Sequence, residues 1–98
     1  MFIVSLHYTV AIEEIDKHLP AHAVFLKENF ANGNFLLSGR KVPRTGGVIL
    51  ATMDDEEALW AVLHKDPFMV HGVAEYALTR FTPSLGRPEA APFLEVRP

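Results

Sequence analysis

The chain has 98 residues, no cysteine and a formal net charge of −3. Its length gives room for one hydrophobic core and hence one domain. The missing cysteines exclude disulfides, thiol nucleophiles and cysteine-ligated metal sites, and they fit a reducing cytoplasm. The nine lysine and arginine residues are scattered, so the basic stripe that a nucleic-acid binder needs is absent.

Hydropathy argues against contact with a membrane. The first residues, MFIVSLH, carry no basic group and turn polar by Ser5, unlike a signal peptide. No apolar run approaches the roughly 20 residues that span a bilayer. We therefore expect a cytoplasmic protein that binds neither membrane nor nucleic acid.

The first half of the chain predicts a strand and a helix. Residues 2–9 alternate between two faces and are rich in β-branched and aromatic residues, as in a strand. Residues 13–18 can form a helical turn, which Pro20 should interrupt because proline lacks an N–H. Proline suits the first helical position, so the main helix is predicted to begin near Pro20 and to end about Ala31, before Asn32-Gly33. This prediction places His22 in the first turn, where the helix dipole would keep it neutral.

The second half predicts two strands, a helix and a last strand. Residues 35–42 and 47–52 are predicted strands joined by a turn, and Asp54 or Asp55 should cap the helix that follows. Asp66-Pro67 ends this helix or opens a short further one. Residues 73–81 form the last strand. The order β-α-β-β-α-β is that of an α+β, ferredoxin-like fold with an antiparallel sheet.

Residues 82–98 differ in character, because they hold four of the seven prolines. Phe93, Leu94 and Val96 lie among them, and a disordered tail would have little use for such residues. We expect an extended arm that docks on its own domain, residues 1–81, or on a partner subunit.

Composition and topology both predict a homodimer. The chain is 10% aromatic, and seven of its ten aromatic residues are phenylalanine, which is generous for so small a body. In a ferredoxin-like fold both helices cover one face of the sheet. An apolar second face must also be covered, and pairing with the sheet of a second copy is one solution.

A set of short motifs resembles the YCII-related family. The motifs, in chain order, are Pro20-Ala21-His22, Gly33, Gly39, Asp66-Pro67-Phe68 and Gly72-Val73. None is specific alone, but their order and spacing over residues 1–81 are. The resemblance implies a dimeric α+β barrel related to muconolactone isomerases and other small enzymes of aromatic breakdown. It also implies a His–Asp active site, at His22 and Asp66. Arg40 departs from the family, where proline often follows the glycine, and it puts a charge beside the pocket.

The residues themselves leave two interpretations open for each half of this pair. His22 shares a helical face with Leu26, so it is either a buried neutral imidazole or a general acid/base with a pKa suited to neutral pH. Asp66 before Pro67 is a preferred helix cap. Its carboxylate can also accept the Nδ1–H of His22 and fix the tautomer, and its two oxygens allow both roles.

Three further residues are candidates for binding a substrate. Ser38 and Arg40 lie two apart, hence on one face of their strand, and can hold a carboxylate or enolate oxygen together. The alternative is that this face meets solvent. His7 lines either the same cavity or the dimer interface.

Other chemistries find little support. His18 and His22 are spaced as metal ligands on one helix face, but Pro20 lies between them and no H-E-x-x-H motif is present, so we expect no metal. Gly46-Gly47 lacks the following helix of a phosphate loop, and no serine lies in a nucleophile elbow. We expect no cofactor.

Two functions remain. The first is a cofactor-independent enzyme in which His22 and Asp66 carry out isomerisation, lactone or elimination chemistry on a small aromatic-derived or enolisable substrate. The second is a non-catalytic dimer that binds a small ligand or another protein, with His22 as packing.

Overall fold

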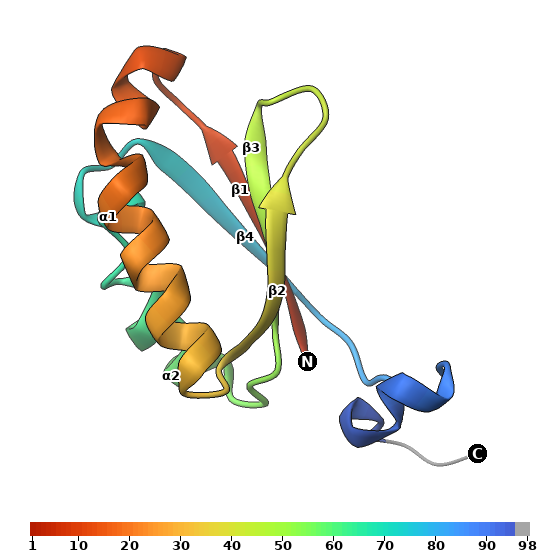
Figure 1. Ribbon diagram of the computed structural model, residues 1–98. Coiled ribbons are helices and arrows are strands. Elements are labelled where there is room, and N and C mark those ends of the chain that lie inside the picture. The colour runs from red at the N-terminus through yellow and green to blue at the C-terminus, as the bar shows by residue number, and fades with distance from the viewer. Residues whose placement is uncertain (96–98) are drawn as a thin grey trace.

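The computed structural model describes residues 1–95 and has a four-stranded antiparallel sheet with its main helices on one face (Figure 1). The strands lie in the order β2-β3-β1-β4. They span Phe2–Tyr8 (β1), Phe35–Arg40 (β2), Gly46–Ala51 (β3) and Ala74–Arg80 (β4); the helices span Ile12–Ala31 (α1), Glu56–Leu63 (α2) and Pro67–Val70 (α3). The predicted ferredoxin-like α+β fold is confirmed, with every strand end within two residues of the expected position.

The core lies between the helices and one face of the sheet. Phe2, Val4 and Leu6 of β1 are at most 2% exposed, whereas the alternate residues point to the other face. The helices contribute Ile15, Leu59, Leu63 and Phe68 to the same cluster. Alternation in the strand and three-and-four spacing in the helices thus meet in one apolar layer.

The predicted start of the first helix is wrong. α1 begins at Ile12 and runs through Pro20, so His22 lies in the middle of the helix instead of in its first turn. Pro20 removes one backbone hydrogen bond, but the turns before it are held by Ile15, which is fully buried in the core. Tertiary packing therefore outweighs the local cost of proline. The helix dipole, which acts within the first turn, therefore does not act on the His22 imidazole as the sequence predicted.

The ends of the helices follow the predicted signals. α1 ends at Asn32 and Gly33, where Gly33 has a φ of +83°, a conformation that costs glycine little. Asp55 caps α2 by accepting the Glu57 N–H at 3.2 Å. Asp66 opens α3 with Pro67 at its first position, so the second of the two alternatives for Asp66-Pro67 is the one observed.

The face of the sheet away from the helices is uncovered in the single chain. Ile3 is 38% exposed and Leu37 55% exposed, and the strand register places Val48, Leu50 and Ala77 on the same face. This apolar face is the one that the sequence predicted to be covered by a second copy.

The segment after β4 extends beyond the end of the sheet and forms a short 3₁₀ helix, Pro88–Phe93 (Figure 1). It returns to its own chain through Glu95, whose carboxylate accepts from the Met1 amino group at 3.1 Å. The Glu95 N–H also donates to the Pro83 carbonyl at 2.8 Å. Val96, which the sequence placed in the arm, lies with residues 97 and 98 outside the described residues.

Replacing Pro20 should stabilise the fold. Pro20→Ala restores a backbone donor inside α1, so we expect the free energy of unfolding to rise by about 1–3 kcal/mol. Urea unfolding followed by circular dichroism measures this change. Lys17→Ala, an exposed substitution in the same helix, is the control and should change the free energy by less than about 0.5 kcal/mol. A Pro20→Ala protein no more stable than wild type would show that the helix bends to suit proline.

Candidate functional site

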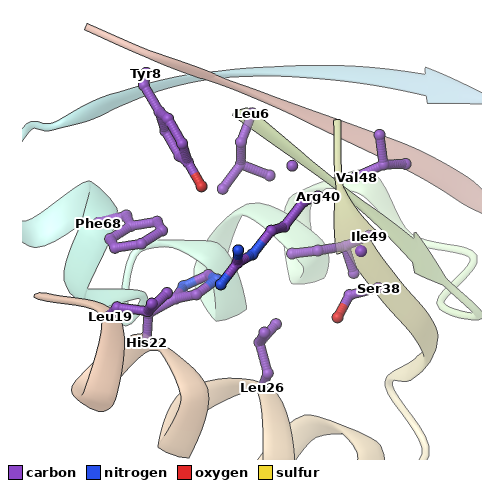
Figure 2. A pocket seen from close by; sticks show the side chains of 12 residues that line it. Leu6, Tyr8, Leu19, His22, Leu26, Ser38, Arg40, Val48, Ile49 and Phe68 are labelled. Carbon is purple, nitrogen blue, oxygen red and sulfur yellow. The ribbon is translucent and has the colours of Figure 1, made fainter. Parts of the chain in front are cut away.

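A pocket of about 160 Å³ lies between α1 and the sheet (Figure 2). Its apolar wall comes from Leu6, Leu19, Leu26, Ile49 and Phe68, and its polar side chains are Tyr8, His22, Ser38 and Arg40. Few polar groups in an apolar cleft are typical of a small-molecule site.

His22 enters this pocket from the middle of α1. The residue is 8% exposed, and its Nδ1 lies 2.7 Å from Oδ1 of Asp66. The Phe68 ring stacks on the imidazole with 3.9 Å between centroids and 8° between planes. Because Asp66 as a carboxylate is an acceptor, this contact assigns the proton to Nδ1 and leaves Nε2 as the nitrogen for a ligand.

Asp66 is fully buried and is held by donors from three elements. Oδ1 accepts from His22 and from the Phe68 backbone N–H at 3.0 Å, and Oδ2 accepts from the Tyr76 hydroxyl at 2.6 Å. Three donors offset the cost of taking a carboxylate out of water. The helix cap and the contact with His22 therefore coexist, and they share one oxygen.

Tyr76 was not singled out by the sequence. It lies in β4 opposite Leu6, on the helix-facing side of the sheet, and it is half-buried. Burial, together with the negative charge of Asp66, raises the pKa of the Tyr76 phenol well above its usual value. The phenol consequently stays protonated and donates throughout the neutral range. The sequence could have indicated Tyr76 as a hydroxyl among the apolar, helix-facing residues of the last strand. That position does not identify Asp66 as its hydrogen-bond partner.

Ser38 and Arg40 both face the pocket. The register pairs them with Ile49 and Gly47, so they lie on the helix-facing side of β2. Figure 2 shows the Arg40 side chain extending into the pocket, with the Ser38 hydroxyl also on the pocket side. The structure thus brings four of the five predicted site residues, including Asp66 behind His22, to one place.

His7 is the exception. It is exposed on the opposite face of the sheet, between Gly46 and Glu75 of the neighbouring strands, and does not line the pocket. The odd position of His7 in β1 dictates this, because side chains alternate along a strand. Of its two predicted locations, only the uncovered sheet face is compatible with the structure.

His18, which the sequence spaced with His22 as a possible metal ligand, lies outside the pocket. His18 stacks on His71, at the end of α3, with 4.0 Å between ring centroids. Within residues 1–95, no group of three or more metal-ligating side chains converges. No helix in the same range is long and apolar enough to cross a membrane.

Comparison with known proteins agrees with this architecture. Residues 1–82 match the YCII-related domain. The chain belongs to the YCII-related family. No curated protein sequence matches it.

Among the solved structures that match, the following one resembles this YCII-related protein over most of both chains. It is the 5-chloro-2-hydroxyhydroquinone dehydrochlorinase TftG from Burkholderia phenoliruptrix AC1100, in complex with 2,5-dihydroxybenzoquinone. The TM-score is 0.70 at 14% identity, covering 86% of this chain and 96% of the other. At this identity the similarity shows a shared fold.

The raised pKa of Tyr76 has a measurable consequence in alkali. The folded pKa lies above that of the unfolded chain, about 10, so its contribution to stability is complete below about pH 10 and is lost as the pH rises further. Tyrosinate absorbance and circular dichroism should therefore show Tyr76 ionising only as the protein unfolds.

Asp66→Asn removes one cause of that shift and should lower the Tyr76 pKa. Tyr8→Phe in both backgrounds leaves Tyr76 as the single tyrosine and assigns the signal. Ionisation of Tyr76 near pH 10 in folded wild-type protein would contradict the buried hydrogen bond.

Proposed function

We propose that this YCII-related protein is a cofactor-independent enzyme in which His22 moves a proton on a small, planar, enolisable substrate. The observation that carries the proposal is the 2.7 Å contact between a pocket-lining imidazole and a fully buried carboxylate. Burying a charge of this kind is costly for stability alone, and it gives a base a fixed tautomer and direction.

His22 is the proposed base and acid. With Nδ1–H donated to Asp66, Nε2 presents its lone pair to the pocket and can accept a proton from a substrate hydroxyl or carbon. The positive charge that results lies beside the Asp66 carboxylate, which stabilises it. The stacked Phe68 ring keeps the imidazole in this plane.

Ser38 and Arg40 are the proposed binders of the substrate's negative oxygen. They reach the pocket from β2, on the sheet side, whereas His22 reaches it from the helix side. A hydroxyl and a guanidinium opposite a base suit an enolate or phenolate, whose charge increases as the proton leaves. The apolar wall limits water around the reacting atoms.

Elimination is the reaction that we favour within this class. Nε2 removes a proton, the electrons of the broken bond form a new double bond, and the leaving group departs with its electron pair. The net loss is one molecule of acid, and no oxidant or cofactor is consumed. TftG, a dehydrochlorinase of the same fold, supports this choice, and its bound dihydroxybenzoquinone is a planar ring of the size and polarity that we propose here.

We also propose that the enzyme works as a homodimer in the cytoplasm. Ile3 and Leu37 lie on the uncovered sheet face, where an equivalent face of a second copy would bury them. The absence of cysteine is consistent with a reducing compartment.

The catalytic proposal is tested with chlorinated hydroxyhydroquinones, by following chloride release and quinone absorbance. Replacing the base in His22→Asn should lower kcat by about 10²–10⁴-fold. His18→Asn, a histidine of the same helix outside the pocket, is the matched control and should retain activity. Binding of the quinone by wild type and His22→Asn alike, with no turnover of any substrate, would instead favour a non-catalytic ligand-binding dimer.

The roles of the anion-binding pair are separated by kinetics. Arg40→Gln should raise KM because it removes a charge that holds the substrate oxygen, and the effect should be smaller for Ser38→Ala. Arg87→Gln, which lies in the arm, is the control. An unchanged KM in Arg40→Gln would remove Arg40 from the site.

The dimer is tested on the uncovered face. Leu37→Glu should convert the protein to a monomer in light scattering, because a buried unpaired charge is strongly unfavourable. Val24→Glu places the same charge on an exposed helix position, where the side chain is 56% exposed, and should leave the dimer intact. A monomeric wild type would refute the proposal directly.

A further inference from the structure

We infer that Tyr76 is a positioning residue that acts through Asp66 and sets how strongly His22 holds a proton. Its catalytic consequence rests on the proposed function of His22, but its effect on His22 does not require a substrate. Tyr76 does not line the pocket and therefore has no contact with a ligand there.

The inference starts from the two oxygens of the Asp66 carboxylate. Oδ1 is shared by two donors, the His22 ring and the Phe68 N–H, whereas Oδ2 has the Tyr76 hydroxyl at 2.6 Å. Asp66 has no exposed surface, so water does not replace a lost donor without rearrangement. Tyr76 is thus the partner on which the solvation of Oδ2 depends.

The donors come from separate parts of the fold. His22 belongs to α1, the Phe68 N–H to the first turn of α3, and Tyr76 to the edge strand β4. A carboxylate bound at one oxygen alone can turn about its Cβ–Cγ bond. Binding Oδ2 to the sheet fixes the plane in which Oδ1 meets His22.

The Tyr76 hydroxyl also changes how the negative charge of Asp66 is shared between its two oxygens. A strong donor at Oδ2 withdraws negative charge from Oδ1, so His22 faces less charge than an unassisted carboxylate would present. Because the raised pKa keeps the phenol protonated, this donor is present throughout the neutral range. Removing it should make His22 bind its proton more tightly.

The experiment measures the protonation of His22 by NMR of its ring nitrogens in the free protein. In Tyr76→Phe the pH at which His22 is half-protonated should rise, corresponding to about three- to tenfold tighter proton binding. Asp66→Asn should move it the other way, and should also shift the ring proton from Nδ1 to Nε2, since the Asn amide can donate to Nδ1.

Thr52→Val is the matched control. It removes a hydroxyl whose 2.6 Å bond to the Gly33 carbonyl lies at the other end of the sheet, away from Asp66. It should lower the Tm without moving the His22 midpoint, which separates positioning from general loosening. Two results for folded Tyr76→Phe would overturn the inference. They are an unchanged pH of half-protonation of His22, and a shift of that pH in the same direction as in Asp66→Asn.

A second substitution tests the inference even if Tyr76→Phe does not fold. In the Tyr8→Phe background, 3-fluorotyrosine replaces Tyr76 alone and makes the phenol a stronger donor. The His22 midpoint should then fall relative to the Tyr8→Phe protein, and a rise or no change would contradict the inference. None of these readouts needs turnover, so an inactive wild type would defeat the proposed function and leave this inference standing.

Discussion

The site depends on one buried charge, the carboxylate of Asp66. A fully buried carboxylate is tolerated only where donors replace its water, and here they come from the middle of α1, the start of α3 and the edge strand β4. His22 lies 44 residues before Asp66 in the chain, so the charge has all of its bonds only when α1 is packed against α3 and β4. The same bonds orient the imidazole that faces the pocket. The same carboxylate therefore joins three elements of the fold and fixes the geometry of the site.

The core and the pocket lie side by side between the helices and the sheet. The helix-facing side of the sheet supplies apolar contacts near Phe2 and Val4, and farther along it opens into the pocket beneath α1. Phe68 belongs to both regions, since it is buried in the core and stacks on His22. The pocket is thus an extension of the core in which a few side chains are polar.

Much of this arrangement could be predicted from the sequence, and the failures have physical causes. Alternation in β1, the Asn32-Gly33 stop and the Asp66-Pro67 cap are local signals, and each was interpreted correctly. The start of α1 was not, because Ile15 holds the turn before Pro20 through contacts that are distant in sequence. Tyr76 was missed for the same reason: its partner lies ten residues away and across a layer of the fold. For His7 the sequence left two locations open, the cavity and the dimer interface. Alternation shows which residues share a face of the strand with His7, but it does not show what covers that face.

The position of Arg40 has an evolutionary consequence. It lies at the end of β2, an edge strand with a single neighbour, and its side chain is exposed, whereas His22 and Asp66 lie in buried surroundings. Substitutions at an exposed edge position cost little stability, so residue 40 can vary while the buried pair cannot. A lineage built on this plan can change which molecule the pocket accepts without rebuilding the proton-transfer apparatus. One small scaffold can in this way diversify toward many substrates by changes at its rim.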